Sequence, residues 1–271
     1  MPTEHALQPA ADAQGDLPRV TAPSASARVR AEWRARIVAE YTSAAITHNL
    51  VLWLIQLGAP PDLLDAGLAI VSDELVHSRL SAEVYAAAGG SEPPAIDQGA
   101  LGLARTTDLV GDVLQVCVRV FCLGETVAVP LFSHLRMGCR EPVARAALDR
   151  ILRDEVRHRD FGWDLLDWLL ALDDPSAPPT EPSIDHTPTI ATRVADQLPR
   201  FLRELDDSYG HANAAVIADE TGAISDADRA WGLAPPRDYA DILRRTLDHD
   251  FRPRFDARGI EMPVGLTAGP V

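Results

Sequence analysis

The sequence predicts an all-α protein, built as a four-helix bundle with additional C-terminal helices, and three observations support this prediction. Long stretches rich in Ala, Leu, Val and Arg place apolar residues at the period of an α-helix. Glycine and proline punctuate the chain between these stretches, as they do at helix ends. No segment alternates apolar and polar side chains in the way that a half-buried strand does.

The first two predicted helices are separated by a short turn. Residues 1–25 have no apolar period and are expected to form a disordered tail. The first helix is expected at residues 26–57 and stops where Gly58 and two prolines follow. The second is expected at residues 61–88 and stops at Gly89.

The third and fourth predicted helices follow a loop at residues 91–106. The third is expected at residues 108–137 and contains Pro130, which removes one backbone hydrogen bond. That proline either makes a harmless kink or opens the helix, and the sequence alone does not rank the two. The fourth is expected at residues 142–172, since Pro142 suits the first turn of a helix.

The chain is therefore predicted to contain one bundle and one extension. The bundle covers residues 26–172, and a proline-rich linker covers residues 173–188. Residues 189–271 are expected to be a helical extension that packs on the bundle, with weaker helices at 189–209 and 236–250.

Composition indicates a soluble protein of the cytoplasm. Of the 271 residues, 46 % are hydrophobic, enough for a sizeable core. The net charge of -15 argues against nucleic acids and anionic membranes as partners. The three cysteines form no CxxC pair and are expected to be reduced core thiols. The longest near-apolar run, residues 50–57, is too short to span a bilayer, and no secretory signal is recognisable.

Two of the long predicted helices contain the same unit, DELVH at residues 73–77 and DEVRH at residues 154–158. In both units Glu precedes His by three residues, which places the two side chains on one helix face. A carboxylate and an imidazole on one face are a suitable ligand pair for a transition metal. The resulting candidate ligands are Glu74, His77, Glu155 and His158.

The other two long helices each carry one glutamate in an apolar setting, Glu40 and Glu125. A buried carboxylate is costly unless it is paired or bound to a cation, so both are candidate ligands. Glu32 is the alternative to Glu40 on the same helix. The four glutamates follow one another at intervals of 34, 51 and 30 residues. The two shorter intervals fit antiparallel neighbours, and the longer one leaves room for a crossover between helix pairs.

This pattern resembles the ligand pattern of the ferritin-like di-iron carboxylate superfamily, over residues 28–172. The resemblance implies a centre of two iron ions, although ligand type leaves mixed manganese–iron and di-manganese centres open. The unit at residues 154–158 resembles that of the bacterial multicomponent monooxygenases. In that group the Asp before each Glu supports a ligand histidine, so Asp73 and Asp154 are implied to orient the two imidazoles. The implied ligands are Glu40, Glu74, His77, Glu125, Glu155 and His158.

The resemblance implies an oxidoreductase that uses O2 on a small organic substrate. Hydroxylation is the default reaction, whereas desaturation, N-oxidation and aldehyde deformylation stay open. Some N-oxygenases of the superfamily carry an extra histidine where this chain has Ile151, which disfavours that reaction. Because the chain has neither a GxGxxG loop nor an iron–sulfur cysteine set, an external ferredoxin or reductase is the implied electron donor. The rival interpretations are a ferroxidase or iron-storage protein and a helical binding scaffold.

The sequence also predicts the surroundings of several residues that are not candidate metal ligands. Tyr41 is expected to pack rather than to form a radical, and residues 248–250 (DHD) are expected at a solvated helix end. The apolar residues 50–55 could form a subunit contact in a homodimer. Four of the remaining histidines, expected in the surface or the core, are His48, His134, His211 and His249. The small or apolar residues expected to line a substrate pocket are Ser43, Ala44, Thr47, Phe121, Cys122, Ala128 and Val129.

Overall fold

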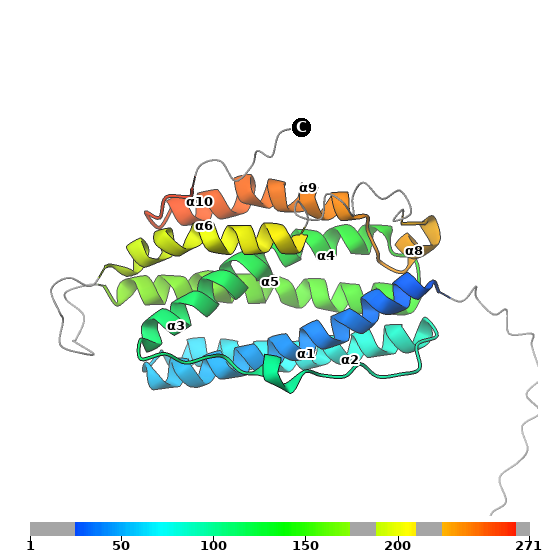
Figure 1. The fold of residues 1–271 in the computed structure, drawn as a ribbon, viewed down its shortest axis with the longest axis horizontal. Coiled ribbons are helices and arrows are strands. Elements are labelled where there is room, and N and C mark those ends of the chain that lie inside the picture. Colours follow the sequence, from blue (N-terminus) through cyan, green and yellow to red (C-terminus); the bar gives the residue numbers. More distant parts are fainter. Residues whose placement is uncertain (1–24, 174–187, 210–223, 264–271) are drawn as a thin grey trace, which may run out of the picture.

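The computed structural model describes residues 25–173, 188–209 and 224–263, and this part of the chain is all-α, without a strand. The prediction of an all-α protein is therefore confirmed. Four long helical rods form the body of the molecule (Figure 1). They are α1 (Ala27–Gln56), α2 (Pro61–Ala87), a third rod made of α3 (Leu109–Val116), η2 (Cys117–Glu125) and α4 (Thr126–Gly138), and α5 (Pro142–Ala171).

The rods begin and end at the residues that favour helix ends. The Ser26 hydroxyl accepts a hydrogen bond from the Val29 amide and caps α1. Gly58, with φ of 74°, takes the left-handed conformation that follows α1, and Gly89 does the same after α2. At the start of the third rod, the Asp108 carboxylate accepts a hydrogen bond from the Gly111 amide. Local sequence therefore defines each rod's length.

The third rod departs from the regular helix that the sequence predicts. Its middle segment, η2, is a π-helix that ends at Glu125, whereas Pro130 lies further on, inside α4. The departure from α-geometry is thus upstream of the proline. The rod from Leu109 to Gly138 is also long and apolar enough to cross a membrane, longer than the 50–57 run. Within its most apolar window, 61 % of the residues are buried inside the protein, which is typical of a core helix.

The rods pack in the order α1, α2, α5 and third rod, and α3 also contacts α1. The connection between α2 and α3 runs back along the length of the body, so that α2 and the third rod point the same way (Figure 1). It contains the short 3-10 turn η1 (Gln98–Leu101). The long interval between Glu74 and Glu125 therefore does contain a crossover.

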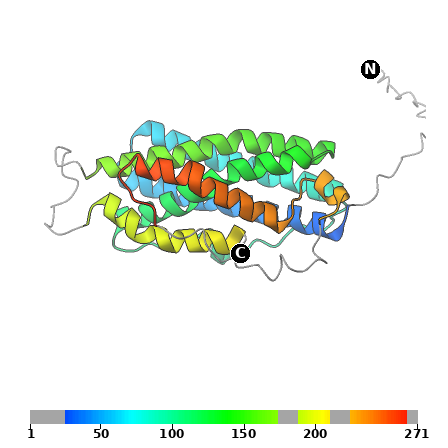
Figure 2. The ribbon, with the colours of Figure 1, turned by 90° about the horizontal axis from the view of Figure 1, so that it is seen from above.

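The C-terminal helices form a further layer that packs on the third rod and α5, on the side away from α2 (Figures 1 and 2). This layer consists of α6 (Ile190–Tyr209), α8 (Asp226–Ala230), α9 (Pro236–Thr246), η4 (Leu247–Phe251) and α10 (Arg252–Asp256). The sequence predicted helices at the positions of α6 and α9 but none at α8. Residues 1–24 of the predicted tail and residues 174–187 of the predicted linker lie outside the described residues, whereas Ala25 is described and buried.

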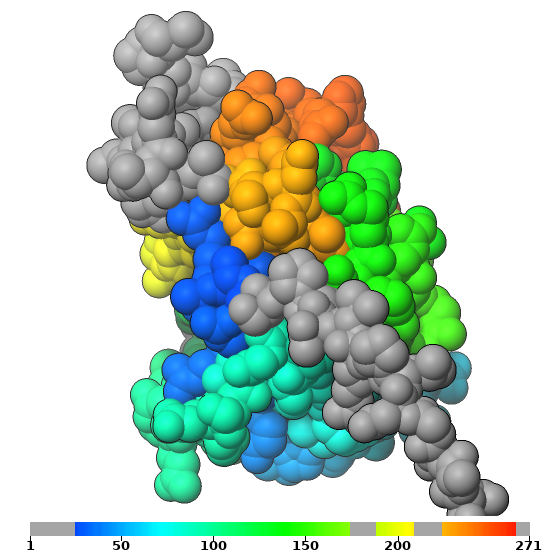
Figure 3. All heavy atoms as spheres, turned by 90° about the vertical axis from the view of Figure 1, so that its right-hand side faces the viewer, coloured from blue at the N-terminus to red at the C-terminus, as the bar shows by residue number. Residues whose placement is uncertain are grey.

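The α8 segment joins the extension to the N-terminus of α1 and to the turn between α4 and α5 (Figure 3). Ser26 donates a hydrogen bond of 2.6 Å to Asp228, and the Trp33 indole donates one of 3.0 Å to the Trp231 carbonyl. The amides of Arg140 and Glu141 both donate to the Ala230 carbonyl. The extension is thereby fixed to one end of the bundle.

Candidate metal centre

The six candidate ligands come from all four rods and are all buried. Glu40 comes from α1, and Glu125 is the last residue of η2. The two Glu-x-x-His units lie on the regular helices α2 and α5, where the three-residue spacing directs Glu and His to the same side. Side chains far apart in the sequence therefore meet in one place inside the body.

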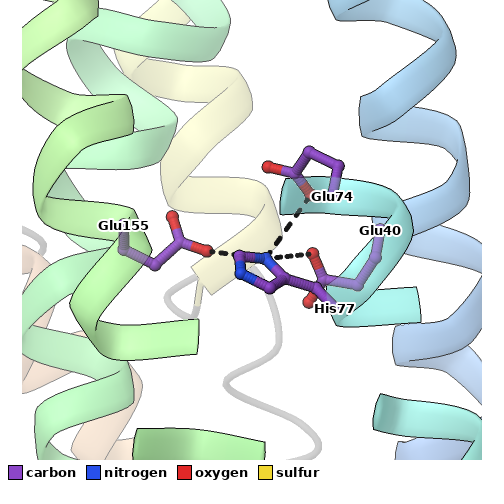
Figure 4. Close-up of side chains that lie close together, drawn as sticks. All are labelled: Glu40, Glu74, His77 and Glu155. Atoms are coloured by element: carbon purple, nitrogen blue, oxygen red, sulfur yellow. Dashed lines mark ion pairs between the residues drawn. The ribbon is translucent and has the colours of Figure 1, made fainter. Parts of the chain in front are cut away.

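Three carboxylates surround the ring of His77 (Figure 4). Its Nδ1 atom lies 3.8 Å from Glu40 Oε2, 3.9 Å from Glu74 Oε2 and 3.7 Å from Glu155 Oε1. One donor atom from each of these four residues lies within 4.8 Å of the others. This first donor group can hold a metal ion.

A second donor group surrounds His158. Its Nδ1 atom lies 3.1 Å from Glu74 Oε1 and 3.6 Å from Glu155 Oε2, and Glu125 completes the group within the same 4.8 Å limit. Glu74 and Glu155 belong to both groups, and the two imidazole rings lie 5.6 Å apart between centroids. The two groups are therefore neighbours that share two carboxylates.

Several donor atoms of the cluster lack a hydrogen-bond partner. One of them, Nε2 of His158, lies on the outer side of the cluster, and the others are Nδ1 of both histidines and one carboxylate oxygen each of Glu74 and Glu155. Buried polar atoms without a partner are rare, because each costs about 1–3 kcal/mol. The positions of the others, on the inner side of the cluster, fit a cation that would satisfy them. These residues therefore suit a transition metal, which is the kind of ion that carboxylate and imidazole ligands predict.

The outer nitrogen of each imidazole faces an aspartate from the opposite helix. His77 Nε2 on α2 lies 3.1 Å from Asp154 Oδ2 on α5, and His158 Nε2 on α5 lies 3.5 Å from Asp73 Oδ2 on α2. Asp154 can thus hold the proton on His77 Nε2 and leave Nδ1 of that ring free as a ligand, whereas His158 Nε2 makes no hydrogen bond. The exchange of aspartates also ties α2 to α5.

Two arginines join these aspartates, and the sequence analysis did not identify them. Arg150 bonds to both Asp73, at 2.9 Å, and Asp154, and Arg157 contacts the same pair at 2.7 and 3.0 Å. Burial would raise the pKa of Asp154, but Arg150 and His77 lower it to about 2. The arginines lie four residues before and three residues after Asp154, a spacing that could have revealed them.

The carboxyls at the centre resist ionisation when no cation is present. Burial, together with neighbouring carboxylates, raises the pKa of Glu155 to about 8 and raises the pKa of Glu74 and Glu125 well above the ordinary value. Burial also acts on Glu40, but the neighbouring His77 and Glu74 side chains lower its pKa overall. Four glutamates in one buried site thus require protons or cations.

The alternatives considered for these ligands lie elsewhere. Glu32 pairs with Arg36 at 3.1 Å and is outside both donor groups. Tyr41, which was expected to pack rather than to form a radical, is 40 % exposed. His48 is exposed, and His134 pairs with Asp238 at 2.9 Å.

Other sequence predictions meet mixed outcomes. Asp248 and His249 are exposed, but they lie inside η4, between α9 and α10, so the prediction of a helix end is wrong. His211 lies outside the described residues. In the stretch 50–55, only Leu52 and Ile55 are exposed, at 49 % and 55 %, and the other side chains serve the core. Only these two could therefore take part in the predicted subunit contact.

The residues predicted to line a substrate pocket lie in or near the core. Phe121 packs edge-on against Phe161 with ring centroids 5.0 Å apart, and the Cys122 thiol lies against α5. One cavity of about 270 Å³ lies between α1, the third rod and α6, and another of about 320 Å³ lies between α4 and α9. Neither cavity includes any of the seven predicted residues, which are Ser43, Ala44, Thr47, Phe121, Cys122, Ala128 and Val129.

Comparisons of the chain with protein-family models, with curated proteins and with solved structures found no match.

Proposed function

We propose that this chain is a ferritin-like di-iron protein that activates O2 to oxidise a small organic substrate. The observation that carries the proposal is the pair of overlapping donor groups. Each group offers one histidine Nδ1 and one glutamate of its own, and both share Glu74 and Glu155. Glu74 and Glu155 would thus contribute to the binding of both of two neighbouring cations.

The charge of the cluster supports two divalent ions. The four glutamates bring four negative charges when they are ionised, and two ferrous ions neutralise them. A neutral centre is compatible with the buried position of all six ligands. Two ferrous ions would supply redox equivalents for O2, which is the chemistry expected of a carboxylate-rich centre with two imidazoles.

The chain's own residues would prepare the site for this chemistry. Asp154 would hold the Nε2 side of His77, and Asp73 lies 3.5 Å from the Nε2 side of His158, while both Nδ1 atoms face the glutamates. Arg150 and Arg157 pair with both aspartates and so hold them in position. The packed rods would keep bulk water away from the centre, which limits side reactions with water.

The proposed reaction needs a substrate and electrons from outside. We propose an external ferredoxin or reductase as the electron donor, and the acidic surface of a chain with net charge -15 favours a donor with a basic docking patch. Hydroxylation of a C–H bond is the default reaction.

Metal analysis combined with O2 exposure tests the proposal. The purified chain is loaded with ferrous ion under nitrogen, desalted and exposed to O2, while iron content and O2 consumption are measured. We expect two irons per chain and rapid O2 consumption that depends on them. A load of many irons per chain would instead favour a ferroxidase or storage protein. Binding of no transition metal by the folded chain would refute the proposal.

A further inference from the structure

Two cysteine thiols touch inside the π-helical segment that leads to Glu125. Cys117 and Cys122 are both fully buried, and their Sγ atoms lie 3.9 Å apart. In a regular α-helix, residues five apart point about 140° away from each other. The i→i+5 pattern of a π-helix instead brings such residues roughly one above the other. The irregular helix therefore creates this contact.

The pair is connected to the candidate metal centre through two elements, η2 and α5. Both thiols are directed at the Gly162 carbonyl on α5, at 3.5 and 3.3 Å, and Gly162 comes four residues after the ligand His158. On the third rod, Cys122 comes three residues before the ligand Glu125. Cys122 is therefore about one helical turn from a ligand along the third rod, and Cys117 is eight residues before the same ligand.

The contact is held in place by close packing. A Cβ atom at Gly162 would lie 2.6 Å from the Phe121 side chain and 2.8 Å from its backbone, so only glycine allows η2 to approach α5 this closely. Burial raises the pKa of the Cys117 thiol, which keeps its proton in place. The third cysteine, Cys139, lies at the end of α4 and contacts the Ala230 carbonyl instead of a thiol.

We propose that Cys117 and Cys122 form a redox-active dithiol that donates electrons during O2 reduction at the metal centre. This inference rests on the proposed function. Two S–H bonds break and one S–S bond forms, which releases two protons and two electrons. These reduce one oxygen atom of O2 to water, while the other is inserted into the C–H bond of the substrate. The external electron donor then reduces the disulfide for the next turnover.

Thiol counting after a single exposure to O2 tests this assignment. The chain is loaded with ferrous ion under nitrogen, exposed to O2, denatured in acid and alkylated, and the peptides are weighed. We expect alkylation to fall from three cysteines to one, and the peptide that contains both Cys117 and Cys122 to lose the mass of two hydrogen atoms. Cys139 should be alkylated throughout. Metal-free protein under O2 should keep three reactive thiols.

Variants separate the dithiol from a passive pair of core thiols. Without substrate, wild-type protein has four electrons available per site, two from iron and two from the dithiol, and should reduce O2 to water. Cys122→Ala has only two and should release hydrogen peroxide, while binding the same amount of iron. Cys139→Ala is the matched control and should behave as the wild type.

The outcomes distinguish this inference from the proposed function. If iron binds and O2 is consumed while all three thiols stay reduced, the dithiol assignment is overturned and the proposed function stands. If the iron-loaded chain consumes no O2, both fail together. Equal peroxide release by the wild type, Cys122→Ala and Cys139→Ala would also overturn the dithiol assignment.

Discussion

The two helices with the repeated motif and the rod with Glu125 reach the same centre in different ways. On α2 and α5 the ligands are presented by regular α-helix, and the exchanged aspartates join the two helices directly. Glu125 lies at the end of a π-helix, which approaches α5 through Gly162. A local repeat thus suffices for four ligands, whereas the position of Glu125 depends on how two rods pack.

The largest effect is expected when a ligand that belongs to both donor groups is removed. Glu74 belongs to both donor groups, so Glu74→Ala should lower the metal content from two ions per chain toward none. Iron analysis after anaerobic loading and desalting measures the change, with circular dichroism to verify the fold. Retention of both ions would show that Glu74 does not bridge.

Removal of an unshared ligand should have about half that effect. Glu125 belongs only to the group around His158, so Glu125→Ala should lose one of the two ions. Glu32→Ala is the control, because Glu32 lies on a ligand-bearing helix but pairs with Arg36. The same iron analysis applies. Full metal content in Glu125→Ala would exclude Glu125 as a ligand and leave α2 and α5 as the main source of ligands.

The stability of the metal-free protein should depend on pH, because a buried carboxyl on α5 resists ionisation. The pKa of Glu155 is raised to about 8 in the folded state, so the unfolded chain loses this proton first as pH rises. The stability of metal-free protein should therefore fall between about pH 4.5 and 8, by up to about 1.4 kcal/mol per pH unit for each such group.

Thermal melts of metal-free and metal-loaded protein at pH 5 and pH 8 check this expectation. Bound cations keep Glu155 ionised, so the fall should disappear in the loaded protein. Asp154 has the opposite sign: its pKa of about 2 adds stability that is lost as pH drops below its ordinary value of 3.8. A melting temperature that is equal at both pH values in metal-free protein would contradict the assignment for Glu155.

The smallest expected effect comes from the packing of the third rod. Gly162→Ala should destabilise the protein by about 1–3 kcal/mol, because the added methyl group meets the backbone of η2. The iron beside Glu125 should also bind more weakly. At Gly124, in the same rod, an added Cβ has no contact closer than 3.7 Å, so Gly124→Ala is the matched control. Denaturant unfolding compares the two, and equal stability would show that the close approach at Gly162 is unimportant.

The sequence alone determined the features that depend on short spacing. Periodicity and capping residues predicted α1, α2 and α5 to within one or two residues, since Ser26, Gly58 and Pro142 act on their own helices. The three-residue spacing in both motifs predicted Glu and His on one face. These signals depend only on residues that are close in the sequence, so they can be recognised without knowledge of the neighbouring helices.

Only the tertiary structure decided which atoms meet. It brought Glu40 rather than Glu32 to the cluster and assigned Asp154 to His77 of the other motif. It also showed the π-helix that brings Cys117 to Cys122, where the sequence indicated a regular helix with a proline further on. The physical reason is that contacts between rods depend on their rotation and separation, and these are set by the packing of the whole core rather than by any one segment.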